Sequence, residues 1–309
     1  MPPTLQKKEG YRIHIAALGD VGATLLLGLK LLGGPLVAGI GIFDVRKEYM
    51  LRYEREMNQI ALPPQVYRLD EGALFDCDAF VFCASAHVPG VGTDIEDVRM
   101  AQLEGNANIL APYADSAAKS AFGGLFTVVS DPVDLLCQCA RHAAEKAARA
   151  CGGRGLAPAQ IRGYGLGVMH ARALYYATRD SRFHMYADEG RAFGPHGRGL
   201  IIANSITAYD DALSRELTQL TLQANLDMRA LGFKPYIAPA ISSAAIPLLQ
   251  TLAGEWHYSA IYRDGIYFGC KNRLAAGDVE VETLTLPDPL QRRIDETRRQ
   301  LQKEDARWI

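Results

Sequence analysis

The sequence predicts an α/β fold with two domains, the first built on a parallel sheet and the second a mixed α/β unit. The first half of the chain alternates short apolar runs with helical patterns, and this βαβ rhythm is typical of a parallel sheet covered by helices on both faces. After the glycine-rich stretch 151–160, short strands mix with long helices instead. The 309 residues, 49% of them hydrophobic, suit two domains with sizeable cores. We therefore expect domains at 1–155 and 156–309.

Each expected element follows from the spacing of its apolar residues. In the first domain the expected strands are 12–18, 37–43, 79–84 and 126–130, and the expected helices are 22–32, 46–59, 98–119 and 132–150. In the second domain the expected strands are 200–203 and 266–269, and the expected helices are 209–231, 241–253 and a charged last helix, 289–304.

Composition and charge exclude several functional classes. The net charge is −2 and both signs are mixed along the chain, which argues against a nucleic-acid or membrane-surface partner. The N-terminus lacks the apolar core of a signal peptide, and the longest apolar run, 23–32, is too short to span a bilayer. The six cysteines fit no zinc pattern or disulfide framework, so we expect no metal site and a cytoplasmic protein with reduced thiols.

The segment 17–22, ALGDVG, lies between an expected strand and an expected helix. This is the place of the dinucleotide fingerprint G-x-G-x-x-G, with Ala17 at the first glycine. Gly19 would let the backbone approach a pyrophosphate, Gly22 would let the helix pack close to the strand, and the helix N-terminus would supply amide donors. A carboxylate at Asp20 would repel the pyrophosphate. The alternative is a turn that needs glycine for its geometry only.

Asp44 ends the second expected strand, 22 residues after Gly22. An acidic residue about 20 residues beyond the fingerprint binds a ribose hydroxyl. Its charge would repel a 2′-phosphate and therefore favours NAD over NADP. Arg46 and Lys47 follow immediately and oppose this preference.

A histidine between glycines, in the segment 193–200 (FGPHGRGL), is by itself consistent with a surface loop. Other segments give it a context, because together with it they resemble, in order, the lactate/malate dehydrogenase superfamily. The matching segments are IAALGDVGATLLLGL (15–29), VFCASAHVPG (81–90), VRMAQLEGNANI (98–109), VVSDPVDLL (128–136), YGLGVMHARALYY (164–176) and FGPHGRG (193–199).

The resemblance implies a Rossmann domain followed by a catalytic domain of the lactate/malate dehydrogenase type. It also implies NAD as cofactor, a small 2-hydroxy or 2-oxo acid as substrate, and a homodimer or homotetramer. His196 takes the place of the general acid/base, a role that suits a histidine because its unperturbed pKa is near 6.5. Arg172 takes the place of the arginine that holds the substrate carboxylate, and Arg99 that of the mobile-loop arginine. The predicted cofactor-binding residues are Gly19, Asp20, Val21, Gly22, Asp44 and Ala84.

Two positions depart from the family pattern. The asparagine that touches substrate and nicotinamide is Asp131 here, and the aspartate that orients the histidine is Met169. A thioether cannot stabilise an imidazolium, so we expect Asp131 to take the place of the missing partner if it lies close to His196. His170 offers another hydrogen-bonding group.

The substrate side of the predicted site also differs. The malate-selective arginine has no equivalent near His87 and Val88, which argues against a dicarboxylate. Phe233 and Lys234 take the place of a small residue beside the substrate. Lys234 could meet an acidic or polar substrate, but solvent is its expected surrounding. Three functions stay open: a hydroxy-acid dehydrogenase, a non-catalytic relative that binds a dinucleotide or metabolite, and an oxidoreductase for another substrate class, such as a sugar derivative.

Overall fold

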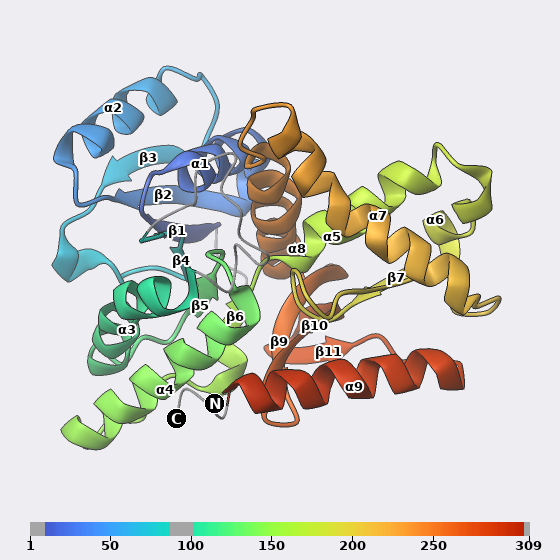
Figure 1. Ribbon diagram of the computed structural model, residues 1–309. Coiled ribbons are helices and arrows are strands. Elements are labelled where there is room, and N and C mark those ends of the chain that lie inside the picture. The colour runs from blue at the N-terminus through green and yellow to red at the C-terminus, as the bar shows by residue number, and fades with distance from the viewer. Residues whose placement is uncertain (1–9, 87–101, 306–309) are drawn as a thin grey trace.

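A nine-stranded sheet forms the centre of the molecule. The computed structural model describes residues 10–86 and 102–305. The order of the strands in the sheet is β11-β10-β9-β6-β5-β4-β1-β2-β3. The elements of the first half lie together at one end of the molecule and α5, α6 and α7 lie at the other (Figure 1).

Six parallel strands in the order 3-2-1-4-5-6 make up the first half of this sheet, and this is the Rossmann arrangement. Helices α1 and α2 cover one face, and α3 and α4 the other (Figure 1). The strands are β1 (Tyr11–Ala16), β2 (Val37–Phe43), β3 (Gln65–Arg68), β4 (Ala79–Phe82), β5 (Leu125–Val128) and β6 (Ile161–Gly163). The helices are α1 (Asp20–Leu32), α2 (Lys47–Asn58), α3 (Leu103–Lys119) and α4 (Val133–Cys151). The predicted fold class is confirmed.

Burial on both faces explains why the strands of this half are continuous apolar runs rather than alternating ones. All four residues of β4 and of β5 are buried, as are all residues of β2 except Ala38. These strands end at the same edge of the sheet because they are parallel. The predicted phosphate loop, Asp44 and Asp131 all follow strand ends, so the sheet brings them to this edge.

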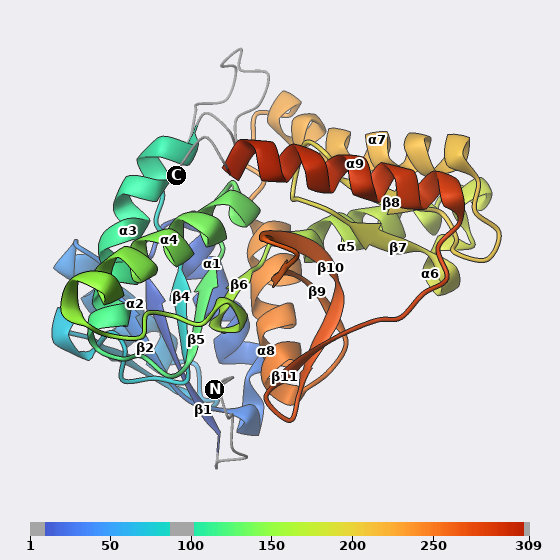
Figure 2. The ribbon, with the colours of Figure 1, turned by 90° about the horizontal axis from the view of Figure 1, so that it is seen from below.

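The second half extends the same sheet with antiparallel strands. It contains β9 (His257–Arg263), β10 (Ile266–Ala275) and β11 (Asp278–Val281), and β9 meets β6 at the pair Gly163 and Ala260. A separate hairpin joins β7 (Arg191–Phe193) to β8 (Ile201–Ala203). The helices are α5 (Leu166–Ala177), α6 (Tyr186–Glu189), α7 (Asp211–Ala230), α8 (Ile246–Ala253) and α9 (Asp288–Asp305). Helix α9 runs past the hairpin and β10 (Figure 2). The domain boundary near 155 stays a prediction.

The segment 241–253, expected to be one α-helix, is instead a π-helix, η6 (Pro239–Ala245), followed by α8. Tertiary packing accounts for the difference. A Cβ on Gly28 of α1 would lie 2.6 Å from Cδ1 of Ile241, so the two segments are in close contact. The Ser243 hydroxyl donates to the carbonyl of Gly165 at 2.6 Å and accepts from the N–H of Val168 at 2.9 Å, which joins η6 to the start of α5.

Candidate active site

The loop between β1 and α1 keeps the geometry of a phosphate loop although its first glycine is missing. Ala17 adopts φ 77°, a left-handed conformation that glycine adopts more easily. A Cβ on Gly22 would lie 2.0 Å from the Ala17 carbonyl oxygen, so only glycine fits there. A Cβ on Gly19 would meet nothing within 4 Å, and α1 begins at the next residue, Asp20, followed by Val21. The open side and the helix N-terminus fit a pyrophosphate.

The carboxylate of Asp44 already has several hydrogen-bond donors. Its Oδ2 accepts from the N–H of Leu18 at 2.7 Å, and its Oδ1 accepts from the N–H of Arg46 at 2.9 Å. The Arg46 guanidinium adds bonds of 2.9 Å from Nε and 3.2 Å from Nη2. Burial raises the pKa of Asp44, but the bonds from Arg46 and Leu18 outweigh it and the pKa is lowered overall. Asp44 therefore stays ionised and joins β2 to the phosphate loop.

Asp20 does not stand alone at the start of α1. Its Oδ2 lies 3.6 Å from Nζ of Lys234, and both side chains are more than half exposed. Lys234 is thus largely in solvent, as expected, and in addition it pairs with Asp20. The ion pair joins the phosphate loop to the segment after α7 and offsets the charge that would repel a pyrophosphate.

The loop that contains His196 is a turn that needs glycine at three positions. Gly194, Gly197 and Gly199 have φ values of 87°, 152° and 88°. A Cβ on Gly194 would also lie 2.7 Å from the Gly199 carbonyl oxygen, so the loop closes tightly on itself. The N–H of Gly194 donates to the carbonyl of Gly269 at 2.9 Å, which fixes this turn against β10.

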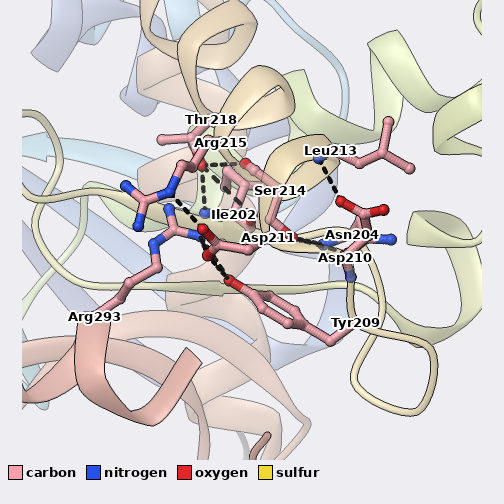
Figure 3. Close-up of polar contacts among 10 residues, drawn as sticks. All are labelled: Ile202, Asn204, Tyr209, Asp210, Asp211, Leu213, Ser214, Arg215, Thr218 and Arg293. Atoms are coloured by element: carbon pink, nitrogen blue, oxygen red, sulfur yellow. Dashed lines mark hydrogen bonds and ion pairs between the residues drawn. The ribbon is translucent and has the colours of Figure 1, made fainter. Parts of the chain in front are cut away.

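Polar contacts hold β8, the strand that follows this loop, against α7, and others join α7 to α9 (Figure 3). The Thr218 hydroxyl accepts from the N–H of Ile202 at 3.0 Å, and Ser214 bonds both to the backbone and to the side chain of Asn204. Asp210 caps α7 by accepting from the N–H of Leu213 at 2.9 Å. The neighbouring ion pairs of Asp211 reach Arg215 on α7 and Arg293 on α9. The hairpin is thus fixed from the side opposite the sheet.

The structure brings His196 and Asp131 together. Nδ1 of His196 lies 3.0 Å from Oδ1 of Asp131, and the histidine side chain is 8% exposed. A carboxylate only accepts hydrogen bonds, so Nδ1 carries the proton in this contact. In a neutral imidazole the lone pair is then on Nε2, the nitrogen that can take a proton from a substrate. Asp131 thus holds the tautomer that a general base requires.

Two further side chains, neither among the predicted site residues, hold Asp131 in place. The buried Asn106 amide donates to the Asp131 carbonyl at 2.7 Å and accepts from the N–H of Ala86 at 2.8 Å. The Ser130 hydroxyl donates to the carbonyl of Ala84 at 2.7 Å. These bonds tie the ends of β4, β5 and α3 together. Asn106 and Ser130 lie in segments that carry the family resemblance, and only this resemblance could have indicated from the sequence that they belong to the site.

A third residue missed from the sequence is Asp134, in the first turn of α4. Its carboxyl is buried and accepts a hydrogen bond from the backbone N–H of His196. Burial is the largest influence and, with the charge of Asp131, it raises the pKa of Asp134 to about 7 against the lowering effect of the His196 N–H. Asp131 and Asp134 therefore contact the ring and the backbone of the same histidine.

Helix α5 begins against His196, because a Cβ on Gly165 would lie 2.7 Å from the His196 Cβ. Arg172 lies seven residues further along, about 10 Å of helical rise. Its Nη1 lies 3.7 Å from the sulfur of Met169, and its Nη2 donates to the Asn225 amide oxygen at 3.3 Å. The fully buried Met169 thus contacts this arginine.

Four other residues named from the sequence have different outcomes. His170 Nδ1 lies 2.9 Å from the Tyr186 hydroxyl, and burial lowers the pKa of His170 to about 4. Arg99, like His87 and Val88, lies outside the described residues.

Within the described ranges, no group of three or more His, Cys, Asp or Glu side chains could hold a metal ion. No helix in those ranges is long and apolar enough to cross a membrane.

Comparison with known proteins points to one superfamily. No protein-family model matches the chain. The L-lactate dehydrogenase of Shouchella clausii (strain KSM-K16) is 30% identical over 140 residues, 45% of this chain and 42% of that protein. The L-lactate dehydrogenase of Geobacillus sp. (strain WCH70) is 28% identical over 130 residues, 40% of this chain and 38% of that protein. The chain thus matches about two fifths of the length of these relatives.

Solved structures match over almost the whole chain. The minor L-lactate dehydrogenase of Enterococcus mundtii, in a ligand-bound form, aligns with a TM-score of 0.75 at 16% identity, covering 96% of this chain and 98% of that one. The apo malate dehydrogenase of Picrophilus torridus aligns with a TM-score of 0.74 at 16% identity, covering 96% of both chains. These likenesses show that the fold is shared.

Proposed function

Because the chain is a divergent member of the lactate/malate dehydrogenase superfamily, we propose that it is an NAD-dependent oxidoreductase for a small 2-hydroxy or 2-oxo acid. The contact between His196 and Asp131 is the main support for this proposal. It gives the predicted general acid/base an anionic partner although the family's aspartate is replaced by Met169. Without such a partner, the imidazolium formed during oxidation would be less stable.

In the proposed reaction a bound nicotinamide would supply hydride chemistry at the substrate carbon, and the residues of this chain move the proton and hold the substrate. His196 takes the hydroxyl proton at Nε2, and Asp131 stabilises the resulting imidazolium through Nδ1. Arg172 holds the substrate carboxylate through its guanidinium fork, and the family resemblance assigns Arg99 as a second substrate-binding arginine. For this, Arg172 exchanges its contacts with Met169 and Asn225 for the carboxylate.

The dinucleotide would lie across the carboxyl ends of the parallel strands. The phosphate loop at Gly19, Asp20, Val21 and Gly22 would hold the pyrophosphate, and Asp44 would bind the adenosine ribose. The segment at Ala84 would lie beside the dinucleotide on the side of its nicotinamide. The open position at Gly19 and the close packing at Gly22 support this assignment. We expect a protein of the cytoplasm, where its six cysteines stay free thiols, as they are in the structure.

The test is a hydride-transfer assay over a panel of 2-hydroxy acids, 2-oxo acids and sugar derivatives, followed by the absorbance of the reduced nicotinamide. We expect turnover with monocarboxylates, a loss of about 100-fold or more in His196→Asn, and little change in the control His184→Asn, an exposed histidine on the turn before α6. Arg172→Lys should raise KM, because an ammonium cannot reproduce a bidentate fork.

The replacement of the family's aspartate by Met169 favours a second function, that of a non-catalytic dinucleotide-binding relative. Calorimetry with NAD separates the two functions. Binding of NAD without turnover on any hydroxy acid, oxo acid or sugar derivative of the panel would support the non-catalytic relative. Turnover with a sugar derivative alone would support the third function, an oxidoreductase for another substrate class.

We also propose that the chain forms a homodimer or homotetramer. Apolar side chains on the packed helices α1 and α8 stay exposed, with Leu27 37%, Leu31 50% and Ile246 39% accessible. Exposed apolar side chains on adjacent helices are typical of a subunit interface. Light scattering of the wild type and of Leu31→Glu tests this, and a monomeric wild type would contradict it.

A further inference from the structure

The site that would receive the adenosine ribose is occupied by an arginine. An ionised carboxylate offers about four acceptor positions, two on each oxygen. At Asp44 all four are in use: the N–H and Nε of Arg46 bond to Oδ1, and the N–H of Leu18 and Nη2 of Arg46 bond to Oδ2. A ribose diol therefore finds no acceptor on Asp44 while the guanidinium stays in this position.

The Arg46 side chain is held on two sides but is free to move outward. Its guanidinium carbon lies 3.5 Å from the centre of the Tyr49 ring, and the side chain is 43% exposed. The two backbone bonds of Asp44 do not depend on this side chain. An outward rotation of Arg46 would thus free two acceptor positions and leave the carboxylate anchored.

Charge at this end of the site is balanced rather than acidic. Arg46 neutralises Asp44, and the exposed Lys47 and Glu48 that follow cancel each other. A lone aspartate repels the 2′-phosphate of NADP, which is the usual basis of NAD preference. Here the guanidinium lies within a few ångströms of that aspartate, and guanidinium groups bind phosphate through paired hydrogen bonds.

We propose that Arg46 is a specificity-determining residue that lets the dinucleotide site accept a 2′-phosphorylated ribose as well as an unmodified one. Arg46 competes with the diol of NAD for Asp44 and pairs with the 2′-phosphate of NADP. The affinities for the two dinucleotides then differ by less than about tenfold. The proposal rests on the dinucleotide binding proposed above and adds the chemistry of the ribose that the site accepts.

The experiment is calorimetric titration of the full chain with NAD and with NADP. In Arg46→Gln we expect NADP to bind about tenfold more weakly and NAD about threefold more tightly, because the phosphate loses its partner and Asp44 gains free acceptors. Arg46→Lys keeps the charge without the fork and should fall between wild type and Arg46→Gln for NADP. The matched control is Lys47→Gln, which removes the same charge one residue away and should change both affinities by the same small factor.

The outcomes separate this inference from the proposed function. The role of Arg46 would be overturned, with the cofactor site intact, if both dinucleotides bind but Arg46→Gln does not weaken NADP and tighten NAD. It would also be overturned if Lys47→Gln weakens NADP and tightens NAD to the same extent. NADP binding to the wild type more than about tenfold weaker than NAD would overturn it as well. If the wild type binds neither dinucleotide, both the proposed cofactor site and the proposed role of Arg46 are contradicted. An unchanged melting temperature in Arg46→Gln shows that the shifts do not come from misfolding.

Discussion

Asp131 Oδ1 lies 3.0 Å from Nδ1 of His196, although 65 residues separate the two along the chain. We propose that this contact makes up for the second departure from the family pattern, at Met169. The anion has moved from α5 to the loop after β5. Two substitutions that each argue against activity when considered alone are, in the structure, one rearranged pair.

Asp131→Asn should therefore weaken the proposed reduction of an oxo acid. An amide leaves the geometry nearly unchanged but does not stabilise an imidazolium, the form that reduction requires. We expect kcat/KM near neutral pH to fall roughly 10- to 100-fold, and the fall of the rate with rising pH to begin at lower pH. The measurement is the pH profile of kcat/KM, with Asp278→Asn on the edge strand β11 as a control. An unchanged profile would show that Asp131 does not act through His196.

The ion pair between Asp20 and Lys234 should tune dinucleotide affinity in opposite directions. Lys234→Ala leaves the Asp20 charge at the phosphate loop uncompensated, so we expect NAD to bind roughly threefold more weakly; Asp20→Ala should tighten binding by a similar factor. In the double variant, Lys234→Ala should lose most of its effect. Calorimetry on the four proteins gives the coupling, and purely additive effects would mean that the 3.6 Å contact has no influence on the bound pyrophosphate.

Ala17 should be a site of stored backbone strain. Its φ of 77° is left-handed, a conformation that costs an alanine about 1 kcal/mol relative to glycine. Ala17→Gly should raise the free energy of unfolding by at most roughly 0.5–1 kcal/mol. Part of this gain is offset because glycine increases the conformational entropy of the unfolded chain. Urea denaturation measures this change. The control is Ala23→Gly within α1, which should lower the stability instead.

Much of the first half could be predicted from sequence because both faces of its sheet are covered. The strand β2 begins and ends where the apolar run 37–43 does. The strands β3 and β6 were missed for physical reasons: β3 is an edge strand with polar ends, and the three residues of β6 include the fully buried Arg162. The π-helix η6 follows from contacts with α1 and α5, which local spacing does not encode.

The site divides in the same way. Gly22 and Asp44 follow from a local pattern of strand, turn and helix. The contact of His196 with Asp131 depends on a sheet edge and a hairpin that meet only in the folded chain, so the residues alone support it only as a conjecture. Asp134 was missed because an acidic residue in the first turn of a helix is expected on grounds of the helix dipole. Its burial beneath the His196 loop is a tertiary property.

Asp134 should make the stability of the protein fall as pH rises through neutrality. Burial raises the pKa of Asp134 to about 7 from the ordinary value of 3.8, so between these values the folded chain keeps a proton that the unfolded chain releases. The free energy of unfolding then decreases with rising pH in this window, by on the order of 4 kcal/mol in total. Asp134→Asn removes this contribution, because its amide oxygen accepts the His196 N–H at every pH. Urea unfolding at about pH 5 and about pH 8 measures the free energy of unfolding of wild type and variant. The variant should gain stability relative to the wild type between the lower and the higher pH. A difference that stays constant, or that shifts toward the wild type, would mean that this carboxyl is ionised in the folded chain throughout the range.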